Sequence, residues 1–224
     1  MNKVHPLLIG FFCLAATLLQ AQPTALVMSP PQGSQWSVDI THPQERVVKE
    51  EAEPTRKPAL PVRMERKVGK NGQQQGEIDF SDGSKHLFYV VGNHLLQKYD
   101  NSEEIAVFGI PANDLENGIY DSLRVPSFPA TAWISEKNFA GMDKLGEVEC
   151  KKHHLSAATA GQELTAWIRA SDLYPLRVQI GEVTYDFSPV KSFGGDVVLP
   201  ANFQRAMTRL LAEESTLKAL QPRK

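Results

Sequence analysis

Apolar and polar residues alternate along much of the first half of this chain. In residues 36–40, for example, the apolar side chains of Trp36, Val38 and Ile40 are separated by polar ones. Successive side chains of a strand point to opposite faces of its sheet, so this period of two predicts a strand with one buried face. Further short strands are predicted at residues 62–65, 77–80, 86–91, 94–99 and 104–108.

The turn sequences between these strands favour antiparallel hairpins. Gly92 and Asn93 separate two predicted strands, and both tolerate the positive φ that a two-residue hairpin turn needs. A Ser-Asp-Gly turn occupies residues 81–83. Residues 69–72 read Gly-Lys-Asn-Gly, which is also interpreted as a turn because it lacks the spacing of a phosphate-binding loop. The first half of the chain is therefore predicted to form an antiparallel meander.

A second group of strands follows a break in this pattern. Residues 111–128 contain prolines and have apolar residues at near-helical spacing, which predicts one short helix. Residues 132–139 are interpreted as a connecting segment that packs across the sheet. Pro175 is expected at the start of a strand, where a missing backbone N–H is tolerated. The strands of a second meander are predicted at residues 148–155, 164–168, 176–180 and 183–187.

The end of the chain has the periodicity of a helix. Its apolar residues fall on one face, and Pro200 is tolerated just before them. An amphipathic helix of this kind is expected to cover an apolar surface. The residues of the apolar face are Phe203, Ala206, Met207, Leu210 and Leu211.

The first residues have the features of an export signal. Lys3 precedes an apolar run over residues 7–19, which is too short to cross a bilayer of about 30 Å as a helix. We expect cleavage after Ala21 and a periplasmic or otherwise exported protein; a retained membrane anchor is the alternative. Cys13 follows Phe12, whereas a lipid-modified cysteine follows a small residue, so lipid anchoring is not expected.

Three segments are predicted along the chain. Residues 1–21 form the signal peptide. Residues 22–61 comprise a flexible leader, the short strand at residues 36–40 and a linker rich in charge and proline. Residues 62–224 form a β-rich domain that ends in the helix described above. The linker is interpreted as solvated, and docking of a partner is the alternative.

Composition and charge exclude one class of partner. The 224-residue chain has a hydrophobic content of 42%, which is enough to build a core. Its 24 basic and 26 acidic side chains are spread along the sequence, and the net charge is -2. Binding to a phosphate backbone needs a basic surface, so nucleic acid is not an expected partner.

Candidate chemistry is sparse. Cys150 would be the lone cysteine after signal cleavage, and it is interpreted as a buried structural residue rather than a nucleophile. His153 and His154 are neighbours on a predicted strand and therefore point to opposite faces, so they do not suggest a shared metal ion. Ser171 and Asp172 lack the sequence context of a hydrolase. We expect no catalytic residue, no metal and no cofactor.

Motifs in the second meander resemble the outer-membrane lipoprotein carrier and sorting superfamily. In that family, a strand pair with the pattern W-I-D … P-L-R precedes a Y-x-F strand and a closing L-P-x-x-F motif. Here residues 166–178 contain Trp-Ile-Arg and Pro-Leu-Arg, residues 185–187 read Tyr-Asp-Phe, and residues 199–203 read Leu-Pro-Ala-Asn-Phe. Residues 146–152 resemble the strand before this pair. The resemblance covers about residues 62–203.

The resemblance implies a mainly β, α+β fold, with a curved antiparallel sheet or half-open β-barrel and covering helices. Such a fold would hold acyl chains or the apolar segment of a partner. The family's N-terminal helix is not evident, and residues 41–61 look like an insertion that could alter a binding groove. No functional residue is therefore transferred from the family.

The leading hypothesis is an exported, non-enzymatic protein that binds a hydrophobic ligand, either a lipid or a lipoprotein acyl chain. The first alternative is a module for protein–protein interaction in the cell envelope. The second is an envelope hydrolase that uses Cys150 or Ser171. The aromatic residues that we expect around an apolar cavity are Trp133, Trp167, Tyr185, Phe187 and Phe203.

Overall fold

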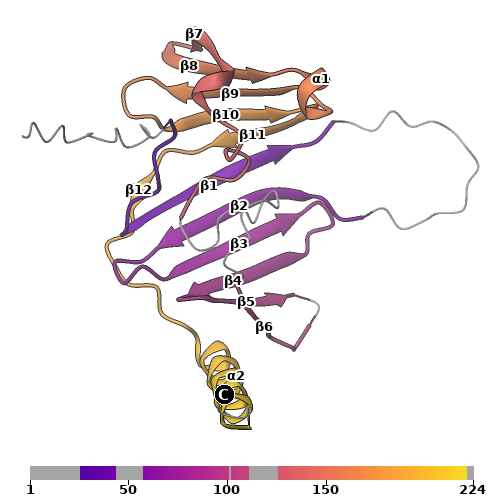
Figure 1. The fold of residues 1–224 in the computed structure, drawn as a ribbon, viewed down its shortest axis with the longest axis vertical. Helices are drawn as coiled ribbons and strands as arrows, with labels where there is room; N and C mark the ends of the chain where they lie inside the picture. The colour runs from indigo at the N-terminus through magenta and orange to yellow at the C-terminus, as the bar shows by residue number, and fades with distance from the viewer. Residues whose placement is uncertain (1–25, 44–57, 101, 111–125, 221–224) are drawn as a thin grey trace, which may run out of the picture.

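A computed structural model describes residues 26–43, 58–100, 102–110 and 126–220 of the chain. Within these ranges, twelve strands form a single antiparallel sheet that does not close into a barrel (Figure 1). The mainly β fold class predicted from the sequence is therefore confirmed. The predicted signal peptide, most of the charged linker and most of the predicted helix at residues 111–128 lie outside the described residues.

The first meander forms one half of the sheet. Each of its strands pairs with the next, and all the strands predicted in this half are present. The turn at residues 69–72 connects the second and third strands, as predicted. The strands are β1 (Ser34–Thr41), β2 (Pro61–Val68), β3 (Gln74–Phe80), β4 (Lys85–Val91), β5 (His94–Tyr99) and β6 (Ala106–Gly109).

The second meander forms the other half, and β1 joins the two. One side of β1 pairs with β2, and the other side pairs with β11 and with the short β12. The order across the sheet is β6-β5-β4-β3-β2-β1-β11-β10-β9-β8-β7, so β6 and β7 lie at opposite ends (Figure 1). The strands are β7 (Phe139–Leu145), β8 (Val148–Leu155), β9 (Leu164–Arg169), β10 (Pro175–Ile180), β11 (Val183–Phe187) and β12 (Lys191–Ser192). Pro175 begins its strand, as predicted.

Strand β7 corrects the prediction that Phe139 lies on a connecting segment. It has no buried residue, so it lacks the alternation by which the other strands were predicted. Its pairing with β8 shifts register between Phe139 and Gly141, and Gly141 has a φ of 115°. A bulge of this kind is common on edge strands, and glycine adopts its backbone conformation without strain.

The main core lies on the face of the sheet that carries Trp36 and Val38, which we call the core face. A loop before β7 covers this face, and its Phe128 is buried among aromatic rings. The ring of Phe128 lies 4.9 Å from that of Trp36, 5.2 Å from Tyr174 and 5.6 Å from Phe187, measured between centroids. Trp133 and Ile134 also pack against this core, so the predicted packing of the connecting segment across the sheet is confirmed for residues 132–134.

The described end of the predicted leader also belongs to the fold. Val27 and Met28 pack against the core cluster, and the Met28 N–H donates a hydrogen bond of 2.9 Å to the Leu173 carbonyl. The expectation of a flexible leader is wrong for residues 26–33. The proline and serine content of this segment indicated a flexible chain, but its two apolar side chains anchor it to the core.

The opposite face of β4 and β5 carries a smaller second core. Helix α2 (Ala201–Leu220) begins there, with Phe203 buried 4.7 Å from the ring of Tyr89. The predicted amphipathic helix is therefore confirmed. The turn between β2 and β3 holds the segment that leads into it, because Asn71 Nδ2 donates a hydrogen bond of 2.9 Å to the Val197 carbonyl. Two short helices, η2 (Glu136–Asn138) and α1 (Ala157–Ala160), flank β7 and β8.

Candidate ligand-binding site at the edge of the core face

The five aromatic residues predicted around a cavity do not form one group. Trp133, Tyr185 and Phe187 pack in or against the main core. Phe187 is buried opposite Val38 of β1, and Tyr185 lies opposite Ile40. The indole N–H of Trp133 donates a hydrogen bond of 2.8 Å to the Ala130 carbonyl. These three line the core face of the sheet.

Trp167 and Phe203 lie elsewhere. The indole N–H of Trp167 donates to Asp143 Oδ2 at 3.1 Å, and Lys152 Nζ lies 5.6 Å from its ring. Trp167 alternates with the buried Ala166 and Ile168, so it projects from the opposite face. Phe203 belongs to the second core under α2. The periodicity of the sequence predicted the strand or helix on which each aromatic residue lies. It did not predict on which of the two faces of the sheet each residue would be buried.

A cavity of about 290 Å³ opens on the core face near the β7 edge. Its walls come from the anchored leader, η2, β7 and β8. Apolar and polar groups both contribute to it. The lining residues are Leu26, Glu136, Phe139, Lys151 and His153.

His153 is the buried polar group of this cavity. Its side chain is 1% exposed, and its ring lies 5.6 Å from that of Phe139 in an edge-to-face arrangement. Nδ1 lies 3.1 Å from the Ser135 carbonyl and 3.2 Å from Asn138 Oδ1. Burial lowers the pKa of His153 below its usual value; the hydrogen bond to the Ser135 carbonyl opposes this shift, and the charge of Lys151 adds to it. The ring is therefore neutral at pH 7.

Apolar side chains are exposed next to the cavity. Phe139 is 49% exposed and Met142 is 53% exposed. Both are paired with core-face positions of β8, Phe139 with His153 and Met142 with Lys151. Exposed apolar groups that adjoin a cavity are typical of a binding surface. Neither residue was predicted as part of a site, because β7 was not predicted as a strand. The available signal was the presence of two apolar residues, Phe139 and Met142, just before the predicted strand at 148–155.

A buried arginine lies at the centre of the core face. Arg66 is 1% exposed, and within the described residues its guanidinium group contacts no carboxylate. Nη2 donates to Gln74 Oε1 at 2.6 Å, Nη1 lies 3.4 Å from the Ser127 carbonyl, and the Phe88 ring centroid is 5.8 Å away. Burial lowers the pKa of Arg66 to about 10, so the group remains charged at pH 7.

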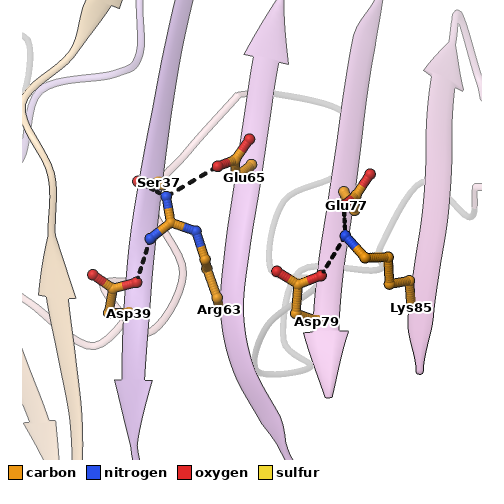
Figure 2. Close-up of polar contacts among 7 residues, drawn as sticks. All are labelled: Ser37, Asp39, Arg63, Glu65, Glu77, Asp79 and Lys85. Carbon is orange, nitrogen blue, oxygen red and sulfur yellow. Dashed lines mark hydrogen bonds and ion pairs between the residues drawn. The ribbon is translucent and has the colours of Figure 1, made fainter. Parts of the chain in front are cut away.

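The opposite face of the same strands is charged and solvated (Figure 2). Arg63 donates to Asp39 at 2.6 Å and to Glu65 at 2.9 Å. Lys85 makes ion pairs with Glu77 at 2.5 Å and with Asp79 at 3.0 Å. These side chains are substantially exposed to water, and exposed ion pairs contribute little to stability.

The residues considered for catalysis are not assembled into a catalytic site. Cys150 is buried, and burial raises the pKa of its thiol, which disfavours the nucleophilic thiolate. Asp172 is held by Arg169 through two hydrogen bonds of 2.8 Å, beside the exposed Ser171. His154 points away from His153 and contacts Thr165 and Glu163. In the described part of the chain, no three metal-binding side chains cluster.

Two comparisons with known proteins return no match. No protein-family model and no curated protein matches this chain. The resemblance to lipoprotein carriers therefore remains a prediction based on short motifs. None of the helices within the described ranges is long and apolar enough to span a membrane.

Proposed function

We propose that this protein is exported and binds a hydrophobic ligand, a lipid or a lipoprotein acyl chain, without catalysing a reaction. The observation that carries the proposal is the cavity at the β7 edge together with the exposed Phe139 and Met142 beside it. An apolar chain that covered these side chains would remove their surface from water, which is favourable by about 25 cal/mol per Å².

The proposal is tested by titration with the uncharged fluorescent probe N-phenylnaphthylamine. The substitutions Phe139→Asp and Met142→Asp each place a charge beside the cavity, and we expect each to weaken binding about tenfold. Val148→Asp is the matched control. Val148 is also partly exposed on the same hairpin, but it alternates with Glu149 and Lys151 and so projects from the opposite face. Equal binding by all three variants would argue against a site on the core face.

A second candidate function is an interaction module of the cell envelope. It is favoured by β7, which ends the sheet and pairs on one side only within the described residues. Such an edge can accept a strand from a partner protein through backbone hydrogen bonds. The test is whether Met142→Pro abolishes capture of a partner protein. Loss of capture with unchanged probe binding would favour this function over ligand binding.

A further inference from the structure

A second cavity lies on the charged face of the sheet, where β1 meets β2 on one side and β12 on the other. Its volume is about 140 Å³. We call it the basic cavity, because positive charge dominates its lining. The charged residues of the lining are Arg63, Arg66, Lys67, Lys191 and Glu65. Arg66 belongs to the core face, so three cations and one carboxylate lie on the cavity's own side of the sheet.

The pairing of the strands brings two lysines to either side of Gln35. Lys67 on β2 and Lys191 on β12 are both paired with Gln35 on β1. Paired residues of an antiparallel sheet point to the same face, and neighbouring strands are about 4.8 Å apart, so the two lysine Cα atoms lie about 10 Å apart. Each ammonium group is carried on a flexible four-carbon chain, so both can reach one anion above Gln35.

One extra residue between β11 and β12 places Lys191 at this cavity. The Ser188 N–H donates a hydrogen bond of 2.9 Å to the Ser37 carbonyl. Lys191, three residues further along, is paired with Gln35, which is only two residues before Ser37. This mismatch is the pattern of a β-bulge, and Pro189 lies within it, where a backbone N–H is not needed. Bulges are common beside binding sites because they redirect a side chain.

The two lysines differ from Arg63 because neither forms an ion pair within the described residues. Lys67 Nζ lies 5.7 Å from the Phe193 ring, which is an uncharged partner. Arg63 instead binds both Asp39 and Glu65 (Figure 2). The carboxylate of the lining therefore already has a cationic partner, and the charges of the two lysines remain for a ligand.

The groups that would hold this ligand are accessible from the cavity. Lys191 is exposed, and Lys67, Gln35 and Ser188 are half-buried. The Gln35 amide and the Ser188 hydroxyl can each donate a hydrogen bond beside the two ammonium groups. A tetrahedral oxyanion presents oxygens in several directions and so suits donors that come from three strands better than a planar carboxylate does.

We propose that the basic cavity binds a phosphate group, held by the charges of Lys67 and Lys191 and by hydrogen bonds from Gln35 and Ser188. Inorganic phosphate and the head group of a phosphomonoester lipid both present this oxyanion. The site lies on the opposite face of the sheet from the cavity beside β7, and the inference does not depend on the proposed function.

Calorimetric titration of the purified protein with inorganic phosphate at low ionic strength tests the inference. Lys67→Gln and Lys191→Gln should each weaken binding about tenfold, which is the effect of one charge-assisted hydrogen bond. Lys98→Gln is the matched control, because it removes the same charge from a half-buried lysine of β5 outside the cavity, and it should leave the affinity unchanged. Glu65→Gln removes the negative charge of the lining and should tighten binding about threefold.

A spectroscopic measurement on the unaltered protein does not depend on the folding of a variant. The side-chain amide signals of Gln35 should shift when phosphate is added at constant ionic strength, and those of Gln179 on β10 should not. Failure of the unaltered protein to bind millimolar phosphate would overturn the inference. Equal binding by Lys67→Gln, Lys191→Gln and Lys98→Gln would overturn it as well.

The source of the phosphate group is identified by sedimentation with phosphatidylcholine vesicles that contain phosphatidic acid. Sedimentation that inorganic phosphate competes away, and that Lys67→Gln abolishes, would support the inference and assign the site to a lipid head group. Binding of phosphate without sedimentation would support it and assign the site to a soluble phosphate compound. Sedimentation that neither phosphate nor Lys67→Gln reduces would contradict recognition of the head group by this cavity.

Discussion

Arg66 and His153 are buried polar side chains on a largely apolar face, and each has a nitrogen without a hydrogen bond in the described part of the chain. The alternation of β2 and β8 predicts which face each residue occupies. It does not predict burial, because burial depends on the loop at residues 126–138, whose contacts come from a distant part of the chain. The cavity beside His153 was therefore beyond prediction from periodicity.

The charge of Arg66 is expected to contribute little to stability. Its nearest acceptors among the described residues are neutral, so no ion pair within that part of the chain offsets desolvation of the guanidinium group. Arg66→Met keeps most of the volume without the charge, and its free energy of unfolding should lie within about 1 kcal/mol of the unaltered protein, or above it. Arg66→Ala should be about 2–5 kcal/mol less stable than Arg66→Met because it leaves a cavity. Urea unfolding measures both; equal losses would show that the charge itself is stabilising.

Burial of two histidines makes stability depend on pH. Desolvation lowers the pKa of His86 and of His153 in the folded protein. Below the unfolded pKa of about 6.5, the unfolded chain therefore binds more protons than the folded one. The stability that these neutral histidines contribute should be at its maximum above this pH. The free energy of unfolding should then decrease as the pH falls toward the folded pKa values, by at most about 1.4 kcal/mol per pH unit for each histidine. Urea unfolding at pH 7.5 and 5.5 tests this; a protein that is more stable at pH 5.5 would contradict it.

Among the elements, sequence patterns predicted ten of the twelve strands, and the two that were missed lack local alternation. β7 has exposed or half-buried residues throughout, and β12 has only two residues, so neither carries a buried-face pattern. The anchoring of Val27 and Met28 was missed because it depends on contacts with residues distant in sequence, such as Leu173. Prediction of the strands was therefore reliable where one face is buried, as in β1, and failed at the β7 edge and for the two-residue β12.

Gly76 in β3 leaves room for the ring of Phe88, on the neighbouring β4, to lie against the strand. A Cβ atom at Gly76 would lie 2.0 Å from the ring of Phe88, which is 1% exposed and cannot move aside. Gly76→Ala should lower the free energy of unfolding by about 1–3 kcal/mol through overpacking. Gly109→Ala in β6 is the control, since a Cβ there meets no atom within 4 Å. Thermal unfolding compares the two variants. If Gly76→Ala left the stability unchanged, the Phe88 ring would not be fixed against the strand.

Helix α2 is attached by its first turns. Phe203 is 1% exposed against Tyr89, whereas Leu211 is 45% exposed. Phe203→Ala should therefore cost about 3–5 kcal/mol, and Leu211→Ala should change the free energy of unfolding by less than about 0.5 kcal/mol. Guanidinium unfolding followed by tryptophan fluorescence measures both. Similar losses for the two variants would mean that the helix is held along its whole length.

At the scale of the whole molecule, one sheet separates two environments. Its core face buries aromatic rings and ends in a cavity, while its opposite face carries the ion pairs of Figure 2 at the centre and α2 at one end (Figure 1). The sheet does not close, so the edge at β7 leaves the cavity accessible. This architecture supports ligand binding by burial of apolar surface rather than by reactive groups.

Native mass spectrometry of protein purified from the cells that make it can show whether the protein carries the proposed hydrophobic ligand. We expect a mass above that of the polypeptide, and we expect organic extraction to remove the excess and recover it as a lipid. A protein that has the mass of the polypeptide alone before extraction, with no lipid in the extract, would contradict it.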